Sequence, residues 1–194
     1  MDYHEESPGL AEQHLAIIVR IRTTNTQIMK ILIDQKEIEQ LVATVAKRIQ
    51  TEWDETTDKV FICLLNGGYM FFSDLVKCLP DNIECDFMRV KSYHNKKQGD
   101  IQITKDLEIP IKGKDVYIVD DIYDSGNTVA AVIDYLNVKH PKSISLVTLA
   151  TRESSPIPTV TAYFGKTIGE EWLVGYGMDN SKGYMRNNAN IYAI

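Results

Sequence analysis

Residues 116–132 read V-Y-I-V-D-D-I-Y-D-S-G-N-T-V-A-A-V, and this stretch decides the fold class. Four residues that suit a buried strand run directly into two acidic residues, Asp120 and Asp121. A third carboxylate, Asp124, opens a small polar loop, which leads into an apolar run with helical spacing. We predict a buried strand over 116–119, a helix over 128–138, and a ligand-binding loop between them.

The loop between this strand and this helix has the composition of an anion site. Gly126 lets the backbone turn tightly and approach a ligand closely. The amides of Asn127 and Thr128 open the helix, where N–H groups point toward a bound anion. Together with the hydroxyls of Ser125 and Thr128 they form a cradle for a phosphate. It is not a Walker loop, because the G-K-[ST] ending is absent.

The three aspartates need a role other than holding the phosphate, because carboxylates repel an anion. Asp120 and Asp121 can accept hydrogen bonds from a ribose diol, directly or through Mg²⁺, and Asp124 can act as a general base. The alternative is that these residues only end a strand and cap a helix. Their position after a buried strand favours the ligand role, since unpaired carboxylates are costly to hold near a core.

Strand and helix patterns alternate along the rest of the chain. Asp34 and Glu37 have the spacing of a capping box at the start of one helix, and a second helix is predicted over 69–78. Strands that are apolar on both faces and alternate with helices indicate an α/β fold whose central, mostly parallel sheet is flanked by helices. Ligands bind beyond the carboxyl ends of such strands. The other predicted strands cover 15–22, 31–33, 60–65, 83–90, 101–103, 143–150, 160–164 and 172–176.

Composition excludes several classes of function. The chain has 194 residues and a net charge of −6, which argues against a general nucleic-acid binder and against attraction to anionic membranes. The start, M-D-Y-H-E-E-S-P-G-L, lacks the pattern of a signal peptide, and no apolar run approaches the ~20 residues that span a bilayer. Cys63, Cys78 and Cys85 form no C-x-x-C pair and fit a reducing compartment. We therefore expect a cytoplasmic protein with no nucleic-acid or membrane partner.

The stretch Y-I-V-D-D-I-Y-D-S-G-N-T at 117–128 resembles the phosphoribosyl-pyrophosphate loop of type I phosphoribosyltransferases. Three further segments resemble hypoxanthine-guanine phosphoribosyltransferases, in order and at similar spacing. They are L-L-N-G-G-Y-M-F-F-S-D-L (64–75), R-V-K-S-Y-H-N-K-K-Q-G-D-I (89–101) and W-L-V-G-Y-G-M-D (172–179). Four segments in register are far more specific than one loop, and the resemblance extends over residues 31–190.

This resemblance implies an enzyme of purine salvage. Such an enzyme transfers ribose 5-phosphate from phosphoribosyl pyrophosphate to a ring nitrogen of hypoxanthine or guanine, which gives IMP or GMP and pyrophosphate, with Mg²⁺ as cofactor. By the same resemblance, Asp120 and Asp121 hold the ribose hydroxyls and the metal. Asp124 accepts the proton of the purine imidazole, and residues 124–128 hold the 5′-phosphate. Catalysis of this kind is mostly electrostatic and positional.

Two loops are expected to handle the leaving group and the solvent. Asn66 and Gly67 resemble the pyrophosphate-binding turn, which contains a cis peptide in this family, although Asn66 stands where relatives often carry a basic residue. Ser92 and Tyr93 resemble the start of a mobile lid that excludes water during transfer. The alternatives are a plain Gly-Gly turn and an ordinary hairpin connection.

The base is expected to lie against a segment near the C-terminus. By resemblance, Trp172 stacks on the purine, Leu173 supplies a backbone contact, and Asp179 lies near the base and a metal. Arg186 meets pyrophosphate, although the spacing from Asp179 is one residue longer than in the family. The alternative for Trp172 is a place in the core.

The largest departure from the family lies at 148–155, T-L-A-T-R-E-S-S. Relatives carry a lysine after this strand that donates to the purine O6, and here Thr151 stands in its place, followed by Arg152. Either Arg152 takes over as the donor, or the base preference has changed, or Arg152 is a surface cation. The alternatives to a salvage enzyme for hypoxanthine and guanine are therefore a phosphoribosyltransferase for another base and a non-catalytic regulator that senses phosphoribosyl pyrophosphate.

The resemblance also divides the chain into three segments. Residues 1–30 form an N-terminal extension that can belong to a small hood subdomain built from the chain ends. Residues 31–165 form the phosphoribosyltransferase core, and residues 166–194 form the C-terminal hood and the base-binding segment. The family usually forms dimers or tetramers, so a homo-oligomer is expected.

Overall fold

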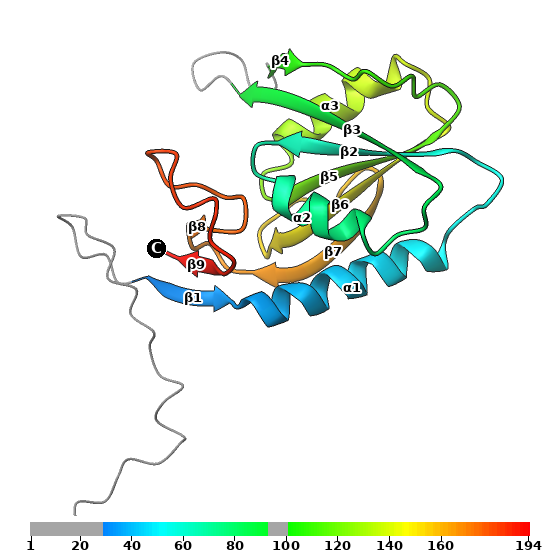
Figure 1. The fold of residues 1–194 in the computed structure, drawn as a ribbon. Coiled ribbons are helices and arrows are strands. Elements are labelled where there is room, and N and C mark those ends of the chain that lie inside the picture. Colours follow the sequence, from blue (N-terminus) through cyan, green and yellow to red (C-terminus); the bar gives the residue numbers. More distant parts are fainter. Residues whose placement is uncertain (1–28, 93–100) are drawn as a thin grey trace, which may run out of the picture.

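A six-stranded sheet forms the centre of the structure, a computed structural model that describes residues 29–92 and 101–194 (Figure 1). The strand order is β4-β3-β2-β5-β6-β7, and all neighbours are parallel except the edge strand β4. The predicted α/β fold with a mostly parallel sheet is confirmed. The strands are β2 (Lys59–Leu65), β3 (Ile83–Ser92), β4 (Ile101–Lys105), β5 (Asp115–Tyr123), β6 (Ser143–Arg152) and β7 (Thr161–Ile168).

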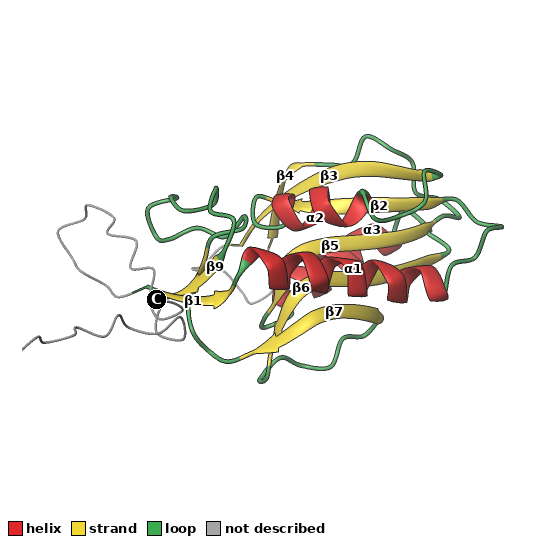
Figure 2. Cartoon of the chain, turned by 60° about the horizontal axis from the view of Figure 1, so that its bottom comes forward, coloured by secondary structure: helices red, strands yellow, loops and turns green. Residues whose placement is uncertain are grey.

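Helices cover both faces of this sheet. Figure 2 shows α1 (Gln35–Thr51) and α2 (Tyr69–Val76) in front of the sheet and α3 (Asn127–Asn137) behind it. Side chains of β2 alternate between two cores: Phe61 and Cys63 pack with α1 and α2, whereas Val60 and Ile62 pack with α3. Burial on both faces explains why the central strands are continuous apolar runs. Within the described part of the chain, none of the helices is long and apolar enough to cross a membrane.

The start of α1 follows the predicted capping box only in part. The Asp34 carboxylate accepts a hydrogen bond from the Glu37 amide at 2.8 Å, as expected of an N-cap. The Glu37 carboxylate does not complete a box but pairs with Lys166 of β7. This ion pair ties the first turn of α1 to the edge of the sheet.

A second, three-stranded sheet lies beyond the carboxyl ends of the central strands (Figure 1). Its order is β1-β9-β8, and both pairings are antiparallel. Its strands, β1 (Lys30–Ile33), β8 (Leu173–Val174) and β9 (Ile191–Ala193), come from the two ends of the described chain. The strand predicted at 15–22 lies outside the described residues.

Two central strands run further than their apolar patterns predict. β5 continues through the acidic pair to Tyr123, and β6 continues to Arg152. Parallel pairing persists there, with Asp120 opposite Thr148 and Tyr123 opposite Thr151. The prediction ended both strands too early, because backbone pairing with a neighbouring strand, rather than side-chain polarity, decides where a strand ends. The acidic pair therefore belongs to the strand and does not follow it.

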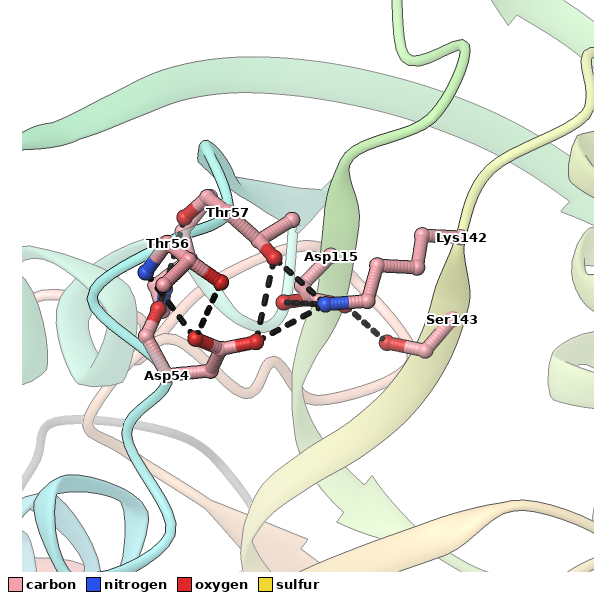
Figure 3. A network of polar contacts seen from close by, with 7 residues as sticks. Asp54, Thr56, Thr57, Asp115, Lys142 and Ser143 are labelled. Atoms are coloured by element: carbon pink, nitrogen blue, oxygen red, sulfur yellow. Dashed lines mark hydrogen bonds and ion pairs between the residues drawn. The ribbon is translucent and has the colours of Figure 1, made fainter.

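The amino end of the sheet is held by a polar network (Figure 3). The Asp54 carboxylate accepts hydrogen bonds from the amide and hydroxyl of Thr56 at 2.9 and 2.6 Å and from Lys142 at 2.9 Å. Lys142 also lies 3.8 Å from Asp115, which accepts a hydrogen bond from the Ser143 hydroxyl at 2.7 Å. These contacts join the loop after α1 to the first residues of β5 and β6.

Candidate active site

A pocket of about 350 Å³ lies at the carboxyl ends of β2, β3, β5 and β6, under the small sheet. Most of the predicted site residues meet there, from four separate parts of the sequence. The convergence supports the prediction that this end of the sheet binds a ligand. The predicted residues that line the pocket are Gly67, Asp120, Asp121, Asp124, Thr128, Arg152, Trp172, Leu173, Asp179 and Arg186.

The other predicted residues are not among the described residues that line the pocket. Thr151 is only 7% exposed within β6. Ser92 is the last residue of β3, and its side chain lies outside the described part of the chain, as does Tyr93. The remaining predicted residues absent from the lining are Asn66, Ser125, Gly126 and Asn127.

Apolar residues complete the pocket wall, and sequence reasoning assigned none of them to the site. Four of them belong to apolar runs that indicate core, and only their position at the carboxyl ends of parallel strands could have singled them out, whereas Met178 follows β8. A purine ring needs such apolar surface on its faces. These residues are Leu64, Leu65, Val90, Ile122 and Met178.

The acidic pair of β5 carries the strongest electrostatic perturbation in the pocket. One Asp120 oxygen accepts a hydrogen bond from the Asp121 amide at 2.9 Å, and one Asp121 oxygen accepts from the Ile122 amide at 2.7 Å. Burial and the neighbouring charge of Asp121 raise the pKa of Asp120 well above its usual range. Burial also raises the pKa of Asp121, against the opposing effect of Asp120 and Arg186. A bound cation or a set of hydroxyl donors would relieve this repulsion.

The turn after β2 packs directly against the acidic pair. The peptide bond between Leu65 and Asn66 is cis, in the segment where the resemblance predicts such a bond. A Cβ atom on Gly67 would lie 2.0 Å from a carboxylate oxygen of Asp121, so any larger residue there would displace that carboxylate. Gly177 has a φ of 101°, and its own Cβ would lie 2.0 Å from the Gly67 carbonyl. Three segments distant in sequence therefore meet at this turn.

The loop before α3 has the geometry of an anion cradle. Gly126 is the N-cap, has a φ of 74°, and accepts a hydrogen bond from the Ala130 amide at 2.8 Å. In the described part of the chain no side chain caps this helix start. A left-handed glycine before a helix turns successive amides toward one point, which suits a phosphate.

The segment that follows β7 exposes the ring of Trp172 and is attached to α2 through Tyr176. Trp172 is 61% exposed on the pocket wall, so it is not a core residue. The buried Tyr176 donates a hydrogen bond to Asp74 of α2 at 2.6 Å, and burial together with this bond raises the pKa of Tyr176. This contact joins the segment to the helix that follows the Gly67 turn.

Arg186 reaches the pocket despite the longer spacing from Asp179. Its guanidinium lies 2.8 Å from the Asp179 carboxylate and donates to the Gly177 carbonyl at 2.6 Å. The extra length is taken up by a local turn, in which the Gly183 amide donates to the Asn180 carbonyl at 2.9 Å. Arg186 and Asp179 therefore enter the site as an ion pair.

Arg152 is not a surface cation, because its side chain is only 9% exposed. Its Nε lies 3.1 Å from the Asp124 carboxylate. Its Nη1 donates to the carbonyls of Gly169 and Glu171 at 2.7 and 3.1 Å. Arg152 thus joins the loop of Asp124 to the segment that leads into Trp172.

The pocket fits a metal ion that is held mainly by a substrate. Among the described residues no group of three or more acidic, histidine or cysteine side chains is arranged to hold a metal. Asp179, predicted as a third ligand, is paired with Arg186. Mg²⁺ in phosphate sites usually takes one or two carboxylates and completes its shell with water and phosphate oxygens. Asp120 and Asp121 suit that arrangement, because their mutual repulsion favours a cation.

Comparisons with known proteins agree with this geometry. A family model described as phosphoribosyl transferase domain matches residues 29–181. A hypoxanthine phosphoribosyltransferase of Escherichia coli is 37% identical over 160 residues, which cover 80% of this chain and 90% of that protein. A hypoxanthine-guanine phosphoribosyltransferase of Aquifex aeolicus is 34% identical over 169 residues, which cover 86% and 94%.

Solved structures agree in fold as well. A hypoxanthine-guanine phosphoribosyltransferase of Bacillus anthracis superposes with a TM-score of 0.79 at 30% identity, covering 85% of this chain and 98% of that one. A hypoxanthine phosphoribosyltransferase of Trypanosoma cruzi, solved with its product IMP, gives 0.78 at 28% identity, covering 84% and 92%. The chain therefore belongs to the phosphoribosyltransferase family, among the hypoxanthine and hypoxanthine-guanine phosphoribosyltransferases.

Proposed function

We propose that the chain transfers the 5-phosphoribosyl group of phosphoribosyl pyrophosphate to hypoxanthine or guanine, forming IMP or GMP and releasing pyrophosphate in purine salvage. One observation carries the proposal: a single pocket joins the acidic pair of β5, the start of α3, the Gly67 turn and the exposed ring of Trp172. These four features suit a ribose, a phosphate, a pyrophosphate and a planar base. The named relatives support the same reaction.

The sugar donor is proposed to bind across the ends of β2 and β5. Residues 124–128 hold its 5′-phosphate with loop amides, and Asp120 and Asp121 accept hydrogen bonds from the ribose hydroxyls. The amides of the turn at Asn66 and Gly67 face the pyrophosphate, and Arg186, which donates to the Gly177 carbonyl beside this turn, contributes charge. Asp120 and Asp121 would hold Mg²⁺ together with the donor, and the bound cation would neutralise negative charge on the leaving pyrophosphate.

The base is proposed to lie between Trp172 and the apolar wall that contains Ile122. The main chain of Leu173 and the carboxylate of Asp179 fix its edge. Asp124, which is 58% exposed and faces the pocket, accepts the proton of the imidazole nitrogen as the bond to the ribose forms. The two carboxylates of the acidic pair favour the positive charge that develops on the sugar ring.

For the preferred base, one observation favours a second candidate function. Thr151 is nearly buried, and the guanidinium of Arg152 already contacts a carboxylate and two carbonyls. A site without a committed cation for O6 discriminates weakly between an oxo and an amino group. This favours, as a second candidate, a phosphoribosyltransferase with altered base choice.

The experiment is a panel of hypoxanthine, guanine, xanthine and adenine, each incubated with phosphoribosyl pyrophosphate and Mg²⁺ and followed by pyrophosphate release. We expect turnover with hypoxanthine or guanine, and loss of product formation on addition of a chelator that excess Mg²⁺ reverses. Turnover with adenine alone would establish the second candidate. Absence of turnover with every base, combined with binding of the sugar donor in calorimetry, would indicate a regulator that senses phosphoribosyl pyrophosphate.

Three further expectations, on domain organisation, oligomeric state and cellular location, accompany this proposal. The small sheet of β1, β9 and β8 would be the hood that, with residues 166–194, covers the base, and residues 31–165 would supply most of the core. A homo-oligomer, dimeric or tetrameric, follows from the family resemblance. A cytoplasmic location fits the cysteine usage.

A further inference from the structure

The contacts of Arg152 assign it a role different from that of a base ligand. Its side chain is 9% exposed, and three acceptors surround the guanidinium: the Asp124 carboxylate and the carbonyls of Gly169 and Glu171. These acceptors belong to two elements that the chain brings together only by folding. One is the loop after β5, and the other is the segment between β7 and Trp172.

The shape of the guanidinium makes this a rigid connection. Its donors lie in one plane at fixed angles, so the Nε contact at 3.1 Å and the Nη1 contacts at 2.7 and 3.1 Å are set together. Displacement of one element would break contacts to the other. The distance between the Asp124 carboxylate and the backbone that carries Trp172 is thereby held at one value.

Turning Arg152 toward a base would be costly. A nearly buried cation would give up a charged partner and two carbonyls to donate to one neutral oxygen. The segment has separate attachments on its outer side, since the Ser154 hydroxyl contacts the Glu170 carboxylate at 2.6 Å and the Glu153 amide donates to the Ile168 carbonyl at 3.0 Å. Those contacts keep the segment folded but do not touch Asp124.

We propose that Arg152 is a positioning residue, which sets the proton acceptor Asp124 at the correct distance from the stacking ring of Trp172. This inference rests on the proposed transfer to a purine. It assigns the choice between oxo and amino bases to groups other than Arg152, because the guanidinium is committed to the protein. Loss of Arg152 then impairs the chemical step for every base alike.

The test compares Arg152→Met, which keeps much of the length of the side chain but none of its donors, with Arg152→Lys. Kinetic constants are measured for each base that the wild-type protein turns over. We expect Arg152→Met to lower kcat by about 10- to 100-fold, with the ratio of kcat/KM between bases changed by less than about twofold. Arg152→Lys should recover only part of kcat, because an ammonium group cannot reach both elements in one geometry.

A second readout does not depend on activity. Acrylamide quenching of Trp172 fluorescence should change in Arg152→Met, and the change should vanish when Trp172 is replaced by Phe, which leaves Trp53 as the remaining tryptophan. Ser154→Ala is the matched control, since it removes an exposed contact of the same segment and leaves the guanidinium contacts intact. It should alter neither quenching nor kcat.

Several outcomes would overturn the proposal. A rise of tenfold or more in KM for 6-oxopurines alone, with kcat unchanged, would make Arg152 a base ligand. Quenching and kcat equal to those of Ser154→Ala would remove its positioning role. If Arg152→Met does not fold, Arg152→Lys carries both readouts with the charge retained. A quenching change in a protein without transferase activity would uphold the connection between the two elements while refuting the proposed function.

Discussion

At the amino end of the central sheet Asp54 and Asp115 both face Lys142, whereas at the carboxyl end Asp120 and Asp121 face each other. Hydrogen bonds from Thr56 and then from Lys142 lower the pKa of Asp54. Burial and then the charge of Asp121 raise the pKa of Asp120. One aspartate, Asp54, therefore stabilises the folded chain at the amino end of the central sheet, whereas another, Asp120, destabilises it at the carboxyl end.

The difference has opposite consequences for stability as pH changes. A carboxylate whose pKa is lowered on folding contributes stability above its ordinary pKa of about 3.9, and this contribution is lost as pH falls through the folded pKa. A carboxylate whose pKa is raised on folding binds its proton more tightly in the folded state. Stability then falls as pH rises from about 3.9 through the folded pKa. The acidic pair at the carboxyl end of the sheet thus lowers the stability of the ligand-free protein, and ligand binding can restore it.

The largest effect is expected when Asp124, the proposed proton acceptor at the carboxyl end, is removed. Asp124→Asn should lower kcat by about 10²- to 10⁴-fold and change KM for the sugar donor by less than about threefold, because the amide cannot accept the imidazole proton. Steady-state kinetics with saturating Mg²⁺ measure both constants. Asp54→Asn, the same replacement at the amino end, should leave kcat unchanged. Unaltered turnover in Asp124→Asn would show that another group accepts the proton.

An intermediate effect is expected when the repulsion within the acidic pair is relieved. Asp120→Asn should raise Tm of the ligand-free protein at pH 7 by about 2–4 °C, since a neutral amide removes the cost of placing an ionisable carboxyl beside Asp121. The gain should shrink as pH is lowered toward 4, because the unfolded chain then also binds the proton. The same variant should lose most of the stabilisation that Mg²⁺ and the sugar donor confer. Melting curves between pH 4 and 8 test this, and a lower Tm at pH 7 would show that the pair is not repulsive.

The smallest effect is expected at the amino end. Asp54→Asn should lower Tm at pH 7 by about 1–3 °C, because its partners Thr56 and Lys142 lose an exposed charged acceptor. The difference from wild type should persist at pH 5 and disappear as pH falls through the lowered pKa of Asp54. Added salt should reduce it, as expected of exposed charges. A difference that grows in acid would contradict the assignment of Asp54 as the stabilising group.

Local motifs of the site were predictable because their chemistry is contained in a few consecutive residues. The loop at 124–128 was recognisable from Gly126 and its polar neighbours, and the structure gives this glycine a φ of 74°. Alternating core faces in β2 likewise followed from its apolar run. The end of β5 was placed too early, since the pairing of Asp120 with Thr148 depends on a strand that lies elsewhere in the sequence.

The partners of Arg152 and the lining residue Ile122 were beyond prediction for a related reason. Arg152 donates to backbone carbonyls, which every residue carries, so no side-chain pattern at 169–171 predicts the contact. Ile122 reads in the sequence as an ordinary apolar strand residue. It lines the pocket because the neighbouring strands end close to it. The exposure of Trp172 depends in the same way on what packs around it.

By itself the sequence determined that this chain folds as an α/β protein with a polar, glycine-containing loop after an acidic strand, because side-chain period and turn chemistry act over a few residues. Only the tertiary structure decided that Arg152 is committed to Asp124, that Arg186 pairs with Asp179, and that Gly67 leaves room for Asp121. Such choices depend on distances of a few ångströms between distant segments. Burial and Coulomb energies, which set those choices, exist only once the chain has folded.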